Sequence, residues 1–204
     1  MVGFYNYTVW LTYLGLVSGV TGVVFAANGN PFAAVICLII SGVCDMFDGR
    51  IARTRKRNEQ EKEFGIQIDS LCDLVSFGVL PPMICFSLGL TQWYHMIVYA
   101  LFVLAAVIRL AYYNVKEHFR SEQEEKVYYG LPVTNSSIIF PLIYILSRFF
   151  QWGKIVYFVF LIVVMLLFVL KFKMKKAKAW FLIVASICAI LAVLFLILVE
   201  LNLI

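Results

Sequence analysis

The sequence predicts an all-α protein that crosses the membrane several times, and two observations lead to this fold class. Hydrophobic residues make up 63% of the 204 residues and charged residues only 14%, a far more apolar composition than a soluble domain of this length has. The apolar residues are also gathered in long runs along nearly the whole chain, as is typical of helices that cross a bilayer. We therefore expect a single integral membrane domain over residues 1–204, with the lipid bilayer as its solvent.

Seven apolar runs are each long enough to form a transmembrane helix. They cover residues 8–27, 31–52, 66–90, 93–114, 132–150, 154–171 and 179–200. Pro81 and Pro82 lie inside the third run, where we expect them to kink or break the helix because proline has no backbone N–H to donate. No basic segment comes before the first run and no small-residue cleavage site follows it, so we expect it to remain as a helix rather than be removed as a signal peptide.

Lysine and arginine are distributed unevenly between the two sides of this topology. If the N-terminus is cytoplasmic, fourteen of the 17 basic residues lie in the cytoplasmic loops at 50–64, 115–131 and 171–178, and only Arg148 and Lys154 lie on the opposite side. This bias follows the positive-inside rule and suits anionic headgroups. No soluble domain is predicted that would present the charges to a nucleic acid, so we expect no nucleic-acid partner.

All four aspartates of the chain lie near the predicted cytoplasmic ends of the second and third spans. Asp45 and Asp48 are three positions apart, and Asp69 and Asp73 are four apart, so each pair lies on one face of its helix. Because the two helices cross the membrane in opposite directions, we expect Asp45 to lie level with Asp73 and Asp48 level with Asp69. The predicted result is a cluster of four carboxylates just below the cytoplasmic surface.

Four carboxylates at close range in a low-dielectric site need compensating charge. Ligands that are all oxygen favour hard cations such as Mg²⁺, Mn²⁺ or Ca²⁺, and two divalent ions would neutralise the cluster. Paired metals recur in phosphoryl chemistry. From the residues alone two other interpretations stay open. The aspartates could cap helix ends or form ion pairs with Arg50 or Arg53, or they could line the pathway of a cation transporter.

Small residues surround the aspartates. Gly49, Ala52 and Gly65 lie about one helical turn or less from an acidic residue. They would let a large ligand approach the backbone, although they would equally serve close packing of helices.

The spacing of these residues resembles the signature of the CDP-alcohol phosphatidyltransferase family. The matching positions are Asp45, Asp48, Gly49, Ala52, Arg53, Gly65, Asp69 and Asp73. The spacer between Arg53 and Gly65 is longer than the commonest form of the signature. The resemblance implies a six-helix core, to which the seventh run would add one transmembrane helix, and it implies a homodimer.

The same resemblance implies a role for each residue of the signature. The four aspartates would bind two divalent ions, Mg²⁺ or Mn²⁺, with Ca²⁺ as a further candidate, and Asp73 would also be the general base. Gly49, Ala52, Arg53 and Gly65 would line the site of the CDP-lipid. The active site would face the cytoplasm, and we expect the membrane to be a prokaryotic cell membrane.

Further segments resemble the phosphatidylserine synthases of this family. They are residues 69–78 with Pro81, Arg109-Leu110-Ala111 with Asn114, and Gly130-Leu131-Pro132. This resemblance implies transfer of a phosphatidyl group from CDP-diacylglycerol to the hydroxyl of L-serine, with release of CMP. The same chemistry with glycerol 3-phosphate or an inositol phosphate as the acceptor stays open, as does an archaeal ether lipid as the donor.

Arg109 is the only lysine or arginine in the interior of an apolar run, since the others within the runs lie at or near the run ends. Serine carries a carboxylate, so our hypothesis is that Arg109 contacts this carboxylate or the diphosphate. An ion pair with an aspartate of the signature, or a clamp on backbone carbonyls, is given equal weight. Gly130-Leu131-Pro132 predicts a turn before a helix.

Overall fold

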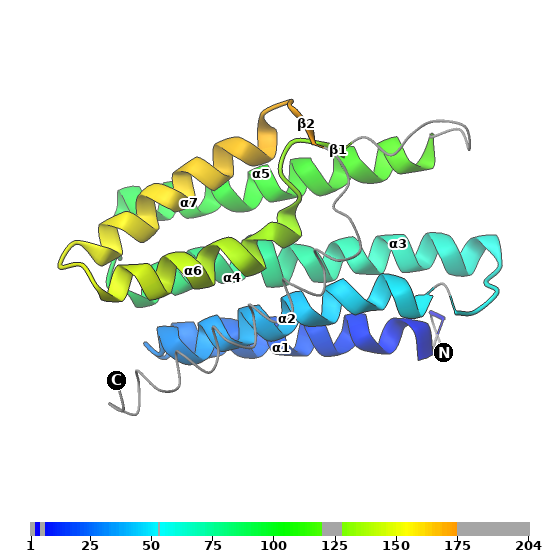
Figure 1. Ribbon diagram of the computed structural model, residues 1–204, viewed down its shortest axis with the longest axis horizontal. Helices are drawn as coiled ribbons and strands as arrows, with labels where there is room; N and C mark the ends of the chain where they lie inside the picture. Colours follow the sequence, from blue (N-terminus) through cyan, green and yellow to red (C-terminus); the bar gives the residue numbers. More distant parts are fainter. Residues whose placement is uncertain (1–2, 5–6, 53, 120–127, 175–204) are drawn as a thin grey trace.

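The computed structural model describes residues 3–4, 7–52, 54–119 and 128–174. The helices among these residues lie side by side in a bundle (Figure 1). In chain order the elements are η1 (Tyr7–Val9), α1 (Trp10–Ala27), α2 (Pro31–Ala52), α3 (Glu59–Asp73), η2 (Leu74–Val79), α4 (Leu80–Ser87), α5 (Trp93–His118), β1 (Tyr128–Tyr129), η3 (Val133–Asn135), α6 (Ser136–Arg148), α7 (Gly153–Val169) and β2 (Lys173–Met174). The predicted all-α fold class is confirmed.

Four helical stretches are long and apolar enough to cross a membrane, and the protein is an integral membrane protein. They are Trp10–Ala27, Pro31–Ala52, Glu59–Ser87 and Trp93–His118. In sequence they overlap the first four predicted runs. The shorter helices α6 and α7 lie within or close to the fifth and sixth runs. The seventh predicted run, 179–200, lies outside the described residues.

The third stretch begins earlier than its apolar run, because Asn58 caps a polar first turn at Glu59. Pro81 and Pro82 do not end this helix, which continues from α3 through η2 into α4. Instead, η2 is a six-residue π-helical segment in which the Leu80 N–H donates to the Val75 carbonyl. The prolines then fall in the first turn of α4, where a missing N–H is tolerated. Of the predicted kink or break, the break is therefore wrong, and a wider turn lies before the prolines.

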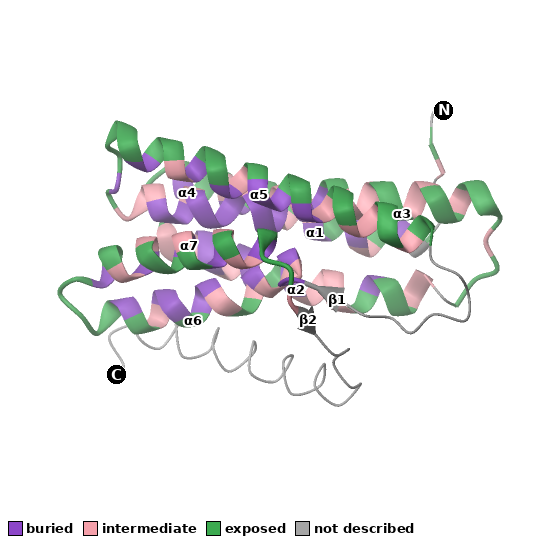
Figure 2. Cartoon of the chain, turned by 90° about the horizontal axis from the view of Figure 1, so that it is seen from above, coloured by how far each residue is buried: buried purple, intermediate pink, exposed green. Residues whose placement is uncertain are grey.

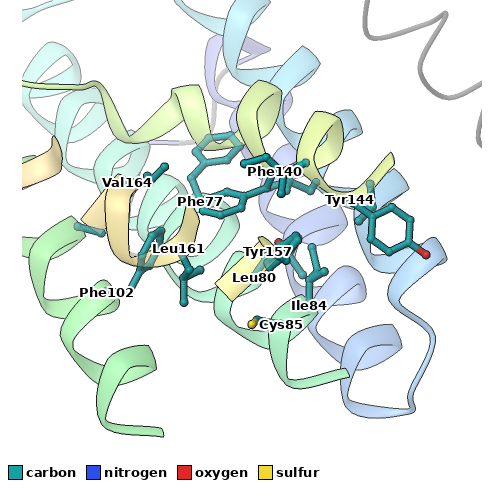
Figure 3. Packing of buried hydrophobic residues seen from close by; sticks show 14 of the residues in the cluster. Phe77, Leu80, Ile84, Cys85, Phe102, Phe140, Tyr144, Tyr157, Leu161 and Val164 are labelled. Atoms are coloured by element: carbon teal, nitrogen blue, oxygen red, sulfur yellow. The ribbon is translucent and has the colours of Figure 1, made fainter. Parts of the chain in front are cut away.

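Side chains from η2, α4, α5, α6 and α7 meet in the apolar core (Figure 3). Phe77 of η2 and Leu80 of α4 are buried there with Phe102 of α5 and Phe140 of α6. The rings of Phe102 and Phe140 meet edge to face, with centroids 5.8 Å apart. Leu161 of α7 is fully buried in the same cluster. Buried residues face the neighbouring helices and exposed residues face outward, toward lipid in the membrane (Figure 2).

Helices α1 and α2 pack closely next to the acidic residues. Hydrogen bonds join them, from Ser41 Oγ to the Gly15 carbonyl at 2.9 Å and from Ser18 Oγ to the Cys37 carbonyl at 2.9 Å. A Cβ atom at Gly22 would lie only 2.8 Å from Cys37 Cβ. Small residues and hydroxyl groups are the usual means of holding helices together in lipid, and here they fix α1 against the helix that carries Asp45 and Asp48.

A short antiparallel ladder, β1 with β2, closes the bundle on the side of α5 and α7 (Figure 1). Directly after β1, the Gly130 N–H donates to the Phe172 carbonyl at 2.8 Å. Gly130 has φ +75°, and a Cβ there would lie 2.9 Å from the Leu170 carbonyl oxygen, so a glycine is needed. The turn predicted at Gly130-Leu131-Pro132 is present and leads through η3 into α6.

Candidate active site

The last turns of α2 and the second half of α3 bring the aspartates together. Asp45 and Asp48 lie on α2, which ends at Ala52, and Asp73 is the last residue of α3 before the π-helical segment. One carboxylate oxygen each from Asp45, Asp48 and Asp69 can be chosen so that all three lie within 4.8 Å of one another. Asp48 and Asp73 are buried, and Asp45 and Asp69 are half-buried.

The fourth carboxyl joins the cluster through a direct contact. The carboxyl groups of Asp45 and Asp73 approach each other closely, and so do those of Asp48 and Asp69. These are the two pairs that antiparallel helices and the spacing of the aspartates predict. All four carboxyl groups therefore belong to one cluster that spans the α2–α3 contact.

The cluster fits a divalent metal. Its donors are carboxylate oxygens, the ligands that Mg²⁺, Mn²⁺ and Ca²⁺ prefer. In the part of the chain that the structure describes, Arg50 forms no ion pair with any of the four aspartates. Arg50 therefore does not supply the compensating charge, and Arg53 lies outside the described residues. The four aspartates could hold a metal, whose charge would offset their own.

A cavity of about 390 Å³ opens beside the cluster. Asp48, Asp69 and Asp73 line one part of it. Three of the four residues predicted to contact the CDP-lipid, Gly49, Ala52 and Gly65, also line this cavity. The fourth, Arg53, is not among the described residues. Two cations that the sequence analysis did not single out, Arg57 and Lys62, also line the cavity, together with Glu117.

A second cavity of about 210 Å³ also borders the cluster. Asp45, Arg109 and Thr134 line it, and η3 contributes Val133. The two cavities share Asp69, Asp73, Leu110 and Tyr113 as lining residues. The carboxylates thus border both a larger and a smaller space.

Arg109 is buried, and its guanidinium donates hydrogen bonds to backbone carbonyls. Its Nε donates to the Leu131 carbonyl at 3.1 Å, and its Nη2 lies 3.5 Å from the Gly130 carbonyl. The guanidinium also lies over the Tyr113 ring, 5.8 Å from the ring centroid. The carbonyl clamp is therefore present, and the same side chain lines the smaller cavity beside Asp69 and Asp73.

A sequence model of the CDP-alcohol phosphatidyltransferase family matches residues 5–203 of the chain. The chain belongs to this family. Membership confirms the resemblance that the signature predicts. It also favours the enzyme interpretation of the cluster over the cation pathway that the aspartates alone leave open.

Several curated relatives are similar to this chain over 52% to 71% of its length. The CDP-diacylglycerol–serine O-phosphatidyltransferase of Mycobacterium tuberculosis (strain H37Rv) is 29% identical over 147 residues, 71% of this chain and 50% of the relative. The protein of the same name from Saccharomyces cerevisiae is 32% identical over 151 residues, 68% of this chain and 54% of the relative. The archaetidylserine synthase of Methanothermobacter thermautotrophicus is 32% identical over 106 residues, 52% of this chain and 45% of the relative. The chain thus spans about half the length of the curated relatives it matches.

In this CDP-alcohol phosphatidyltransferase family member, the site includes contacts from residues outside the signature. Thr12 of α1 is buried and donates a hydrogen bond from Oγ1 to Asp48 Oδ2 at 3.0 Å. Asn114 of α5 donates from Nδ2 to Ser70 Oγ at 2.9 Å, next to Asp69. The sequence signal for Thr12 is weak, a hydroxyl within an apolar run whose first residues, with Leu11 and Gly15, only loosely resemble the first helix of the family. These contacts tie α1 and α5 to the helices that carry the carboxylates.

Proposed function

We propose that this protein transfers a phosphatidyl group from CDP-diacylglycerol to the hydroxyl of L-serine, which gives phosphatidylserine and CMP. The observation that carries the proposal is the carboxylate cluster that borders two cavities, with Gly49, Ala52 and Gly65 around the larger one. Family membership supports the reaction class. The names of the Mycobacterium and Saccharomyces relatives support serine as the acceptor.

Two divalent cations, Mg²⁺ or Mn²⁺, are part of the proposal, with Ca²⁺ as a further ion that the oxygen donors would accept. Asp45, Asp48, Asp69 and Asp73 would hold them. When bound, the ions would neutralise the charge of the diphosphate and of the departing CMP.

Asp73 is proposed as the general base. It lines both cavities and is buried, so a donor in one space and an acceptor in the other would both reach it. Its carboxylate takes the proton of the serine hydroxyl, which becomes a nucleophile. The serine oxygen then forms a bond to the phosphorus that carries the diacylglycerol, and the bond from that phosphorus to the oxygen of CMP breaks.

The larger cavity is proposed to hold the CDP headgroup and the smaller one the serine. Arg109 would contact the serine carboxylate in the smaller cavity. A guanidinium has five N–H groups, so contacts with the carbonyls of Gly130 and Leu131 are compatible with a bond to a substrate carboxylate. The close approach allowed by Gly49 and Gly65 would admit the nucleotide to the larger cavity.

The proposed site faces the cytoplasm, as the distribution of lysine and arginine predicts. The acyl chains of the donor would stay in the bilayer while the headgroup enters from the cytoplasmic leaflet. A homodimer in a prokaryotic cell membrane completes the proposal. An ether-linked CDP-lipid is a second candidate donor, supported by the name of the archaetidylserine synthase relative.

The proposal is tested by CMP release from the purified protein. The protein would be incubated in detergent micelles with CDP-diacylglycerol and Mg²⁺ or Mn²⁺, and L-serine, glycerol 3-phosphate and an inositol phosphate would be added one at a time. We expect CMP release that depends on both L-serine and the metal. Strong release with another alcohol and none with L-serine would overturn the acceptor. A parallel series with the ether-linked donor tests the second candidate.

A further inference from the structure

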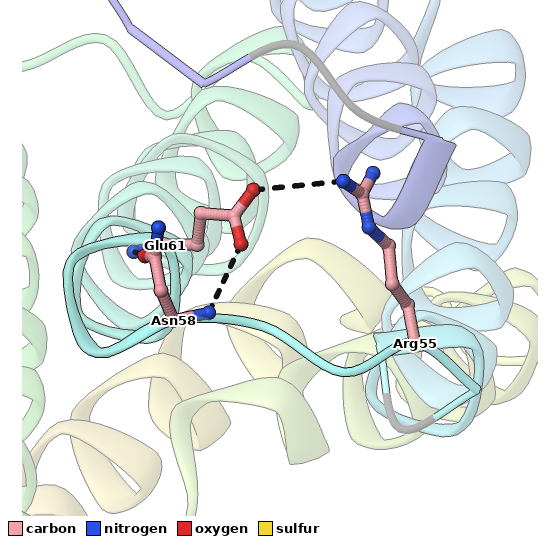
Figure 4. A network of polar contacts seen from close by, with 3 residues as sticks. All are labelled: Arg55, Asn58 and Glu61. Carbon is pink, nitrogen blue, oxygen red and sulfur yellow. Dashed lines mark hydrogen bonds and ion pairs between the residues drawn. The ribbon is translucent and has the colours of Figure 1, made fainter.

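The segment between α2 and α3 is held in place by a polar network around Glu61 (Figure 4). The Asn58 side chain accepts a hydrogen bond from the Glu61 N–H at 2.7 Å, and the Glu61 carboxylate accepts one from the Asn58 N–H at 3.1 Å. This reciprocal pair is a capping box, which fixes the start of α3. The other Glu61 oxygen lies 3.8 Å from Arg55 Nη2, so the same carboxylate also holds the preceding turn.

A second contact fixes the beginning of the segment. The Thr54 hydroxyl donates to the Ile51 carbonyl at 2.8 Å and lies 3.0 Å from the Tyr7 hydroxyl. The chain on both sides of Arg57 is therefore tied to the helices.

Arg57 is the side chain that this arrangement directs inward. Its neighbours Arg55 and Lys56 are exposed, whereas Arg57 is half-buried and lines the larger cavity. Its Nη1 lies 3.0 Å from the position that a Cβ would take at Gly65. The guanidinium thus occupies space that is open because residue 65 has no side chain.

Charges of both signs line this cavity. Asp48, Asp69, Asp73 and Glu117 contribute carboxylates, while Arg57 and Lys62 contribute cations. Within the described ranges, neither Arg57 nor Lys62 forms an ion pair. A guanidinium that lines a cavity without a carboxylate partner is suited to phosphate oxygens, which it can bind through two parallel hydrogen bonds.

We propose that Arg57, assisted by Lys62, binds the diphosphate of the CDP-lipid, and that the network around Glu61 positions Arg57 for this contact. The inference rests on the proposed function, because it takes the CDP-lipid as the ligand of the larger cavity. It assigns a substrate contact to the spacer that the family signature leaves unspecified. Arg57 is then a binding residue, and Glu61 is a positioning residue that acts through the segment it anchors.

The decisive comparison is between Arg57→Gln and Lys56→Gln. Both variants remove one positive charge from adjacent positions of one segment, but Lys56 is exposed and does not line the cavity. Binding of CDP-diacylglycerol would be measured with Mg²⁺ and without acceptor, and KM for CDP-diacylglycerol and for L-serine would be measured by CMP release. We expect Arg57→Gln to weaken donor binding and raise the donor KM about tenfold or more, with the serine KM unchanged. Lys56→Gln should behave as wild type.

Two further variants separate substrate contact from folding. Arg57→Lys keeps the charge but not the planar fork, so it should recover part of the donor affinity. Glu61→Gln should raise the donor KM less than Arg57→Gln does, while kcat stays near the wild-type value. Thermal unfolding in detergent identifies any variant that simply fails to fold. If Arg57→Gln fails to fold, the donor affinity of Arg57→Lys decides whether Arg57 contacts the donor.

The possible failures are distinguishable. If Arg57→Gln binds CDP-diacylglycerol as tightly as Lys56→Gln does, the inference is wrong while the proposed function stands. If wild type releases CMP with another alcohol but not with L-serine, the acceptor assignment fails and the comparison of donor binding still holds. If wild type does not bind CDP-diacylglycerol at all, both are overturned.

Discussion

The carboxyl groups of Asp45 and Asp73 lie close to each other across the contact between α2 and α3. Asp45 is the α2 aspartate further from the C-terminal end of its helix, and Asp73 is the last residue of α3. The smaller cavity is lined by both residues, whereas only Asp73 also lines the larger one. Of this pair, only Asp73 is therefore placed to reach both spaces.

Replacing Asp73 with Asn removes the proposed base while keeping the shape of the side chain. We expect kcat for CMP release with L-serine to fall at least about 100-fold, the size of effect typical of general-base catalysis. Binding of CDP-diacylglycerol should persist, and added Mg²⁺ or Mn²⁺ should not restore kcat. A chelator should abolish wild-type activity, and either metal should restore it. Full activity in the Asp73→Asn variant would show that Asp73 is not the general base.

Thr12→Val tests the hydrogen bond to Asp48. Valine has nearly the shape of threonine but lacks the hydroxyl that donates to Asp48 Oδ2 at 3.0 Å. A hydrogen bond to a charged group contributes about 1.5–3 kcal/mol, so we expect the Mg²⁺ concentration for half-maximal activity to rise about tenfold. Thr21→Val is the matched control, since the exposed Thr21 hydroxyl donates only to the Val17 carbonyl of the same helix. Equal metal dependence in the two variants would contradict the role of Thr12.

Arg109→Gln tests whether the carbonyl clamp also serves the acceptor. Glutamine keeps a donor for the Leu131 carbonyl but has no charge for a carboxylate, so we expect KM for L-serine to rise about tenfold. The KM for CDP-diacylglycerol should stay near the wild-type value. Arg148→Gln, which removes an exposed arginine at the end of α6, is the control. Unchanged kcat and serine KM in Arg109→Gln would show that Arg109 only binds the backbone carbonyls and does not contact the acceptor.

The aspartate pairs were predictable because they depend on regular geometry. A helical period and two antiparallel helices suffice to set Asp45 beside Asp73, and both conditions can be read from the order of residues. The π-helical segment before Pro81 was not predictable, because apolar residues at 74–79 suit an α-helix and a π-helix equally well. Its position follows from the hydrogen bonds that the prolines remove.

The contacts of Thr12 and Arg109 depended on tertiary structure. A threonine in an apolar run is usually a packing residue, and its partner Asp48 lies on another helix. The sequence left two roles for Arg109, because its carbonyl partners come from a turn that Gly130 bends through a positive φ. Arg57 was missed for a related reason, since only the folded segment shows that it alone turns toward Gly65.

A comparison of Gly49 with Gly22 tests which glycines serve the ligand and which serve packing. A Cβ at Gly49 would meet no atom within 4 Å, whereas one at Gly22 would lie 2.8 Å from both Cys37 Cβ and Leu80 Cδ2. We therefore expect Gly22→Ala to lower the free energy of unfolding by about 1–3 kcal/mol, as overpacking does. Gly49→Ala should be at least as stable as wild type, because alanine favours a helix by up to about 1 kcal/mol over glycine.

The larger variant Gly49→Leu then separates activity from stability. Its side chain would enter the cavity of about 390 Å³ that Gly49 lines, so we expect the KM for CDP-diacylglycerol to rise several-fold. Thermal unfolding in detergent micelles should nevertheless stay close to that of Gly49→Ala, since the added atoms meet open space rather than a neighbouring helix. A Gly49→Leu protein that unfolds like Gly22→Ala, or one with an unchanged KM for the donor, would show that Gly49 is a packing residue.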